Sequence, residues 1–214
     1  MSITDEFKFA WPFPKNPNLL NKFLTNFALA SAFVFSKLVF APGVNRINAV
    51  NKGTLLDAIK DRTRPLLTVA NHRSVCDDPL FWAIFSFREF FSNICNYRYI
   101  MAAHDICFKT PLHTWMFSHG RGVPIIRGAG IYQKGVDFCI EKLNENRWVH
   151  VFPEGRVTSE PIRIKWGIAR MVMECVNPPR ILPIWIHRMT DVWPASKPYY
   201  PHFGKVLALL ILLS

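Results

Sequence analysis

Short apolar runs alternate with amphipathic stretches along most of this chain. Leu66 to Ala70 is a mostly apolar run that follows Pro65, and such a run predicts a buried strand. The same pattern predicts further strands at 99–102, 123–126, 148–152 and 181–186, and helices at 79–91, 111–118, 131–144 and 166–175. Strands that alternate with helices predict an α/β domain with a largely parallel or mixed sheet flanked by helices.

Two of these segments carry signals for where an element begins or ends. The helix expected from Pro79 to Phe91 has Asp78 at its N-cap and Pro79 at its first position, which are favoured places for these residue types. The chain closes with the apolar run 206–213, which predicts a final strand or an apolar tail.

Residues 1–45 differ from the rest of the chain. Residues 11–18 are rich in proline and predict an irregular lead-in. The stretch from Phe23 to Pro42 is mostly apolar and carries a single charge, Lys37, and it is about as long as a helix that crosses a bilayer. The polar residues that gather within one third of its helical wheel are Lys22, Thr25, Asn26, Ser36 and Lys37. This favours a helix that lies in or dips into a membrane interface, with a full span and a buried core helix as alternatives.

Composition and charge also indicate a membrane surface. Hydrophobic residues make up 50% of the chain, charged residues 19%, and the formal net charge is +11. A basic protein attracts polyanions, but the basic residues are scattered and no zinc-finger or RNP-like string is present, which disfavours nucleic acid as a partner. Anionic lipid fits better, because each Lys or Arg near it contributes about 1 kcal/mol.

The cysteines and the N-terminus argue against disulfides, a zinc site and two kinds of targeting segment. Five cysteines occur without any C-x-x-C pair, so we expect neither a disulfide framework nor a zinc site, and no metal or tightly bound cofactor is implied. Acidic residues come early, at Asp5 and Glu6, and the first arginine is Arg46. This pattern is neither an Arg-rich transit peptide nor a secretory signal.

The segment Asn71 to Pro79 carries the candidate chemistry. His72 follows a buried strand and Asp77 lies at the start of the next helix, at the strand edge where ligands gather in α/β sheets. A carboxylate on one imidazole nitrogen fixes the tautomer and leaves the other nitrogen free to take a proton. The substrate's own hydroxyl can then be the nucleophile. The alternative is structural, with Asp77 or Asp78 capping the helix and His72 an incidental loop residue.

Charged residues after two other strands are expected at the same edge. Arg127 ends the strand at 123–126, and Glu154, Gly155 and Arg156 follow the strand at 148–152. Arginine suits phosphate because its planar fork donates two hydrogen bonds, and glycine permits a close backbone approach. Solvated arginines and a structural ion pair of Glu154 are the alternatives. The sequence names no oxyanion donor; a backbone N–H near Gly155 or at the start of the Pro79 helix is a candidate.

These segments together resemble the glycerolipid acyltransferase family. His72 and Asp77 match its H-x4-D motif, 122–127 its second block, 152–155 its F-P-E-G block, and 181–186 its apolar fourth block. The resemblance runs from about residue 19 to 204 and is strongest to the mitochondrial cardiolipin-remodelling transacylases. It implies an acyltransferase domain over 46–214, preceded by a lead-in and membrane-interface segment over 1–45.

The resemblance also implies an activity and a place. Such proteins move acyl chains between phospholipids and lysophospholipids without coenzyme A, use cardiolipin, monolysocardiolipin and phosphatidylcholine, and insert into mitochondrial membranes facing the intermembrane space. By this resemblance His72 and Asp77 are catalytic, and Arg127, Glu154, Gly155 and Arg156 bind substrate. The family continues beyond the point where this chain ends at VLALLILLS. This departure keeps open a truncated, non-catalytic membrane-binding form. Independent alternatives are an acyl-coenzyme A-dependent acyltransferase, which shares the same blocks, a phospholipid hydrolase, and a covalent mechanism at Cys76.

Overall fold

The computed structural model describes residues 10–160 and 162–212. The expected absence of a leader at Asp5 and Glu6, and the end of the apolar run at Leu213, lie outside the described residues. Within the described part, seven strands form one mixed sheet in the order β1-β7-β6-β2-β5-β3-β4. The strands are β1 (Arg46–Val50), β2 (Leu66–Ala70), β3 (Tyr99–Ala103), β4 (Gly122–Ile125), β5 (Trp148–Val151), β6 (Arg180–His187) and β7 (Val206–Ile211).

Five neighbouring strands of the sheet, β6, β2, β5, β3 and β4, are parallel. β7 pairs antiparallel with β6, and β1 pairs parallel with β7, so these two run the other way. The expected α/β domain with a largely parallel or mixed sheet is confirmed. The carboxyl ends of β2, β4 and β5, after which the candidate residues come, therefore share one edge of the sheet.

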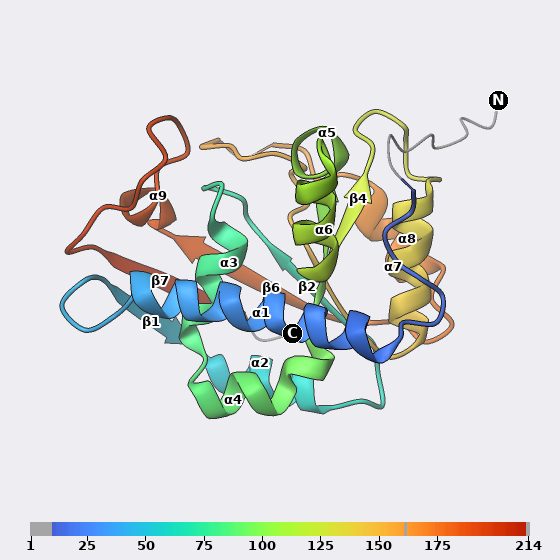
Figure 1. Ribbon diagram of the computed structural model, residues 1–214, viewed down its shortest axis with the longest axis horizontal. Helices are drawn as coiled ribbons and strands as arrows, with labels where there is room; N and C mark the ends of the chain where they lie inside the picture. Colours follow the sequence, from blue (N-terminus) through green and yellow to red (C-terminus); the bar gives the residue numbers. More distant parts are fainter. Residues whose placement is uncertain (1–9, 161, 213–214) are drawn as a thin grey trace.

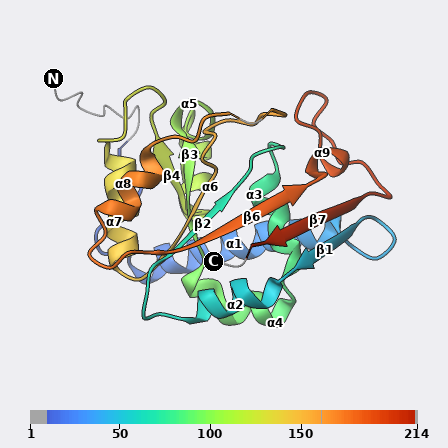
Figure 2. The same ribbon diagram turned by 180° about the vertical axis from the view of Figure 1, so that it is seen from behind.

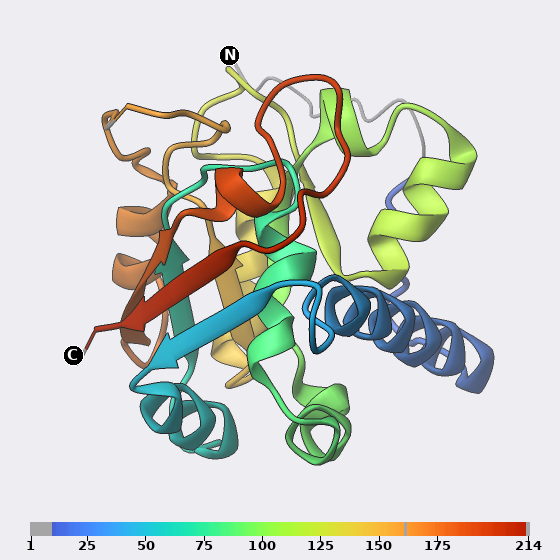
Figure 3. The same ribbon diagram turned by 90° about the vertical axis from the view of Figure 1, so that its left-hand side faces the viewer.

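Helices cover both faces of the sheet (Figures 1 to 3). Their bounds are α1 (Leu19–Val39), α2 (Lys52–Lys60), α3 (Asp77–Phe81), η1 (Trp82–Ile84), α4 (Phe87–Asn93), η2 (Ile94–Asn96), α5 (His104–Cys107), α6 (Pro111–His119), α7 (Lys134–Asn144), α8 (Gly167–Met173) and α9 (Met189–Val192). One apolar core joins the sheet to α1, α2 and α3 through residues such as Phe33, Leu55 and Phe81. A second core joins the opposite face to α7 and α8 through Val136 and Met171.

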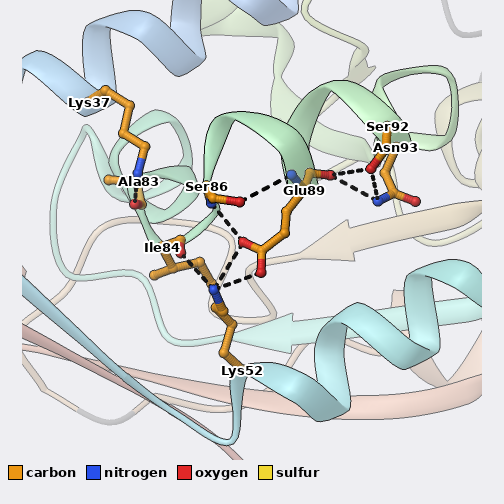
Figure 4. A network of polar contacts seen from close by, with 8 residues as sticks. All are labelled: Lys37, Lys52, Ala83, Ile84, Ser86, Glu89, Ser92 and Asn93. Atoms are coloured by element: carbon orange, nitrogen blue, oxygen red, sulfur yellow. Dashed lines mark hydrogen bonds and ion pairs between the residues drawn. The ribbon is translucent and has the colours of Figure 1, made fainter.

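The helix expected from Pro79 to Phe91 is wrong as a single element. It breaks after Ile84, and Ser86 starts α4 with a capping box in which its hydroxyl accepts from the Glu89 N–H and the Glu89 carboxylate accepts from the Ser86 N–H. Figure 4 shows this box and the Lys52 ammonium, which donates to Glu89 at 3.0 Å. A capping box satisfies two backbone donors that a helix start would otherwise leave unpaired. The serine therefore restarts the helix inside an apolar stretch.

Asp78 is not the N-cap that the sequence predicts. α3 starts at Asp77 after Cys76, and no side chain caps it. The Asp78 carboxylate instead accepts from Arg98 Nε at 2.8 Å, and the Arg98 guanidinium, which is 3% exposed, lies 4.7 Å from the Trp82 ring centroid. A buried arginine needs such a partner, because its charge is costly away from water.

The N-terminal helix turns its polar side chains toward the protein. Thr25 bonds the His119 ring of α6 at 3.2 Å, Ser36 is buried, and Lys37 donates to the Ala83 carbonyl at 2.8 Å (Figure 4). Among the described residues, α1 is the one helix long and apolar enough to cross a membrane. Three residues of the polar stripe predicted on its wheel, Thr25, Ser36 and Lys37, are thus buried or bonded within the domain, while Lys22 is exposed. The outward side of α1 carries several exposed apolar side chains.

We predict that Gly135→Ala destabilises the protein. A Cβ at this first-turn position of α7 would lie 2.3 Å from the Pro124 carbonyl oxygen and 2.6 Å from Ile125 Cδ1, so the helix or β4 must shift. Overpacking of this kind costs about 1–3 kcal/mol, measurable by chemical unfolding in detergent. Gly53→Ala in α2 is the matched control, since nothing lies within 4 Å of its Cβ. Unchanged stability of Gly135→Ala would contradict the close approach.

Candidate active site

His72 and Asp77 meet at the carboxyl end of β2. The imidazole Nδ1 lies 2.8 Å from Asp77 Oδ2, and the Asp77 side chain is fully buried while that of His72 is 21% exposed. An ionised carboxylate only accepts hydrogen bonds, so Nδ1 carries the proton and Nε2 keeps its lone pair when the ring is neutral. The expected contact between carboxylate and imidazole is present, and it leaves a proton acceptor at the partly exposed end of the ring.

Two backbone groups hold the same carboxylate oxygen. Asp77 Oδ2 accepts from the Arg73 N–H at 2.6 Å and from the Ser74 N–H at 2.8 Å, in addition to His72. A buried carboxylate is tolerated when several donors meet it. The loop between β2 and α3 therefore wraps around Asp77, and its shape sets where His72 lies.

Asn71 and Ser74 bond this loop to the neighbouring strand β6 and to the residue that follows α9. The Asn71 amide donates to the Ile186 carbonyl at 2.8 Å and accepts from the Ile186 N–H at 2.6 Å. The buried Ser74 hydroxyl donates to the Trp193 carbonyl at 2.8 Å. Sequence reasoning assigned neither residue a role, because a polar residue in a loop gives no sign of which distant backbone it will meet.

The segment after β5 supports His72 from the other side. The Phe152 ring stacks on the imidazole, with centroids 4.2 Å apart and planes 14° apart. The Glu154 carboxylate is buried and accepts from the His72 backbone N–H at 2.9 Å. Glu154 is therefore at the site as expected, with one oxygen engaged in positioning the catalytic loop, while its role in substrate binding stays a prediction.

Gly155 and Arg156 complete the turn after Glu154. Gly155 has φ +68°, a left-handed conformation that glycine adopts without strain. Its N–H donates to the Phe152 carbonyl at 3.1 Å, so this amide is already used within the turn and is a poor oxyanion donor. Arg156 is exposed next to it, and its role in substrate binding stays a prediction.

Arg127 lies farther from His72 than the sequence suggests. It follows β4 at the edge of the sheet, three strand positions from β2, or about 14 Å at roughly 4.8 Å per strand. Its guanidinium donates to the Asp105 carboxylate at 3.2 Å. The structure thus groups Glu154, Gly155 and Arg156 with the catalytic pair and leaves Arg127 at the margin of the same sheet edge.

A neutral polar network lies behind the catalytic ring. The Thr68 hydroxyl accepts from Trp148 Nε1 at 2.8 Å and is hydrogen-bonded to His150 Nδ1 at 2.7 Å. Burial lowers the pKa of His150 well below its usual value, and the nearby Arg98 acts in the same direction. His150 is therefore uncharged at neutral pH, so it adds no positive charge beneath His72. Among the described residues, no group of three or more His, Cys, Asp and Glu could hold a metal ion.

Comparisons with known proteins place this geometry in a family. A family model of acyltransferases matches residues 48–187. The chain is similar to a tafazzin of Drosophila melanogaster, with 38% identity over 208 residues that cover 93% of this chain and 54% of the relative. It is also 36% identical to an N-acylphosphatidylethanolamine synthase of Arabidopsis thaliana, over 76% of this chain and 58% of that protein.

The chain is also similar to a third curated protein and, in its fold, to a solved structure. A protein named taffazin in Dictyostelium discoideum is 32% identical over 82% of this chain and 62% of its own length, so the chain spans between about half and two thirds of these curated relatives. The crystal structure of the 1-acyl-sn-glycerophosphate acyltransferase PlsC from Thermotoga maritima matches with a TM-score of 0.62 and 19% identity, covering 88% of this chain and 68% of that one. That likeness shows the fold alone.

We predict that Cys76 reacts slowly with alkylating reagents. Burial, with the neighbouring charges of Asp77 and Asp78, raises the pKa of its thiol to about 12, so roughly one molecule in 10⁴ is thiolate at pH 8. The exposed Cys95 is the matched control. Mass spectrometry after iodoacetamide treatment should find Cys95 modified long before Cys76, with the Cys76 rate rising about tenfold per pH unit. Equal rates at pH 8 would contradict this.

Proposed function

The chain belongs to the acyltransferase family, and we propose that it moves fatty acyl chains between phospholipids and lysophospholipids without coenzyme A. The observation that carries the proposal is the His72–Asp77 pair, in which Asp77 holds Nδ1 at 2.8 Å and leaves Nε2 free to act as a base. The similarity to tafazzins supports monolysocardiolipin as acceptor and cardiolipin as product. The raised pKa of the Cys76 thiol, caused by burial and by the charges of Asp77 and Asp78, disfavours a covalent cysteine mechanism.

In the proposed mechanism, His72 acts first as a general base and then as a general acid. Nε2 removes the proton of a lysophospholipid hydroxyl, and the oxygen attacks the acyl carbonyl of a donor phospholipid. The new ester C–O bond forms, the donor C–O bond breaks, and the leaving alkoxide takes the proton from Nε2. Such proton transfer contributes roughly 10²- to 10⁴-fold, and Asp77 stabilises the imidazolium between the two steps.

No activated donor is needed for this exchange. One ester is broken and an equivalent ester is formed, so the equilibrium constant of the reaction is near one and no thioester is needed to drive it. Acyl-coenzyme A as donor is the first alternative that an experiment must separate. A second acceptor is suggested by the 36% identity to the N-acylphosphatidylethanolamine synthase, whose name implies transfer to the amine of phosphatidylethanolamine.

We assign headgroup binding to the basic residues at the same sheet edge. Arg156 is exposed beside Gly155 and Glu154, within reach of a phosphate whose lipid presents a hydroxyl to His72. Arg127 suits a second phosphate, because its distance of about 14 Å from β2 is better matched to a lipid with two phosphates than to one headgroup. Arginine binds such groups in a planar, two-point fashion.

The outer side of α1 is proposed to dip into the membrane. Its exposed residues include Leu20, Phe23, Phe27 and Leu38, which are between 57% and 65% exposed, while some of its polar side chains bond within the domain. An apolar stripe on a helix fixed by its polar side to a basic protein suits interfacial insertion. We place the protein on mitochondrial membranes facing the intermembrane space because of its similarity to tafazzins. Protease protection, compared between intact mitochondria and mitochondria with a ruptured outer membrane, tests this location.

We predict that acyl exchange requires His72. With acyl-labelled phosphatidylcholine as donor, monolysocardiolipin as acceptor and no coenzyme A, label should appear in cardiolipin. His72→Ala should lower the rate by at least about 10² and Asp77→Asn by on the order of 10⁴, while Cys76→Ser and His202→Ala, an exposed histidine of the loop before β7, should not.

Four results would redirect the proposal. Transfer only with added acyl-coenzyme A indicates the thioester-dependent reaction, and label in the amide of added phosphatidylethanolamine indicates the other acceptor. Free fatty acid without a labelled acceptor indicates a hydrolase. Liposome binding with no transfer from any donor indicates a non-catalytic membrane protein.

We predict that the α1 stripe is needed for membrane binding. Each buried Phe contributes about 1.5–3 kcal/mol, so the double variant Phe23→Ser/Phe27→Ser should weaken liposome binding by more than about tenfold in flotation or sedimentation assays. Its fold should be kept, because both side chains are more than half exposed. Met173→Ser/Val176→Ser, at 82% and 83% exposure near the end of α8, is the control and should bind normally. Equal binding of the two variants would move the membrane contact away from α1.

A further inference from the structure

Residues 154–158, which follow β5, hold both backbone groups of His72. The His72 N–H donates to Glu154 Oε2 at 2.9 Å, and the His72 carbonyl accepts from the Thr158 N–H at 3.0 Å. Movement of residues 154–158 should therefore move His72, because the peptide groups on both sides of this residue are hydrogen-bonded to that segment. This segment also carries Arg156.

Arg73, the residue after His72, also bonds to this segment. Its guanidinium Nη1 donates to the Thr158 carbonyl at 2.8 Å and also to the Ser159 carbonyl. Thr158 is thus held at its N–H by His72 and at its carbonyl by Arg73, two adjacent residues of the catalytic loop. On its other side the guanidinium lies 5.8 Å from the Trp185 ring centroid of β6, a distance at which a cation and an aromatic ring attract.

We propose that Arg73 is a positioning residue that locks residues 156–160 onto the catalytic loop, so that Arg156 and His72 Nε2 keep a fixed separation. A phospholipid whose phosphate binds Arg156 then presents its hydroxyl or acyl carbonyl to His72 in one geometry. The inference rests on the proposed function for its substrate. The contacts of Arg73 and His72 with Thr158 and Ser159, called the clamp below, do not depend on that function. Fixing a substrate group relative to a base is a large source of rate.

The guanidinium is suited to this task in a way that an ammonium is not. Its donors are planar and fixed relative to one another, and one nitrogen bridges two neighbouring carbonyls while the guanidinium carbon lies 5.8 Å from the Trp185 ring centroid. Lysine offers a flexible point charge without a planar fork. Arg73→Lys therefore keeps the charge and loses most of the clamp, whereas Arg73→Met keeps the length of the side chain and loses both.

The test combines hydrogen exchange with kinetics. The control is Arg64→Met, which also removes a guanidinium–carbonyl bond, to Pro178 at 3.2 Å, but at the opposite end of β2. In Arg73→Met, peptides that cover 155–160 should exchange amide deuterium at least about tenfold faster, as expected for the loss of hydrogen bonds to a charged group. Arg64→Met should leave that exchange unchanged.

The kinetic arm uses monolysocardiolipin as acceptor in vesicles of fixed composition. Arg73→Met should raise the apparent KM for the acceptor by roughly 10- to 100-fold, with a smaller loss of kcat, and Arg73→Lys should recover only a minor part. Unchanged exchange at 155–160 in Arg73→Met would overturn the clamp, and so would full kinetic rescue by Arg73→Lys. If the unaltered protein transfers no acyl groups, the proposed function fails, and the exchange experiment alone still decides the clamp.

Discussion

The site depends on one buried carboxylate. Asp77 is fully buried, and its Oδ2 accepts hydrogen bonds from the His72 ring and from the Arg73 and Ser74 backbone. A carboxylate in such a place costs several kcal/mol unless donors meet it, so the loop must close around it. That closure gives the loop its shape, sets the tautomer of His72 and leaves Nε2 at the partly exposed end of the ring. The position of the His72 ring thus follows from the hydrogen bonds made to Asp77 Oδ2.

Around this pair, residues far apart in the chain are bonded backbone to side chain. Asn71 fastens the end of β2 to β6, Glu154 holds the His72 N–H, and Arg73 holds the segment that follows Glu154. The Asn71 contact joins this loop to β6, and the Glu154 and Arg73 contacts join it to the segment after β5. The parallel arrangement of β6, β2 and β5 makes this possible, because it brings their carboxyl ends to one edge. The exposed apolar side chains of α1, for which we propose membrane contact, are separate from this network.

Much of the fold follows from the pattern of the chain. The strands at β2, β3, β4, β5 and β6 and the helices at α6, α7 and α8 lie within a few residues of where apolar periodicity places them. The single helix expected from Pro79 to Phe91 does not form, because Ser86 and Glu89 make a capping box inside it. Asp78 looked like an N-cap because it precedes a proline, yet it pairs with the buried Arg98. In both cases the local preference for a helix or a cap gave the wrong prediction, because a specific hydrogen bond, within the capping box or to Arg98, determined the structure.

By itself, the sequence determined the α/β alternation and the pairing of His72 with Asp77, because both depend on spacing over a few residues. Their separation of five positions at the start of a helix lets one loop bring carboxylate to imidazole. Only the tertiary structure decided that Glu154 and Arg73 hold the catalytic loop, that Arg127 stands three strands from β2, and that α1 faces outward with its apolar side. The reason is that these features depend on the order of strands in the sheet and on which distant backbone groups each side chain meets, and spacing along the chain contains neither.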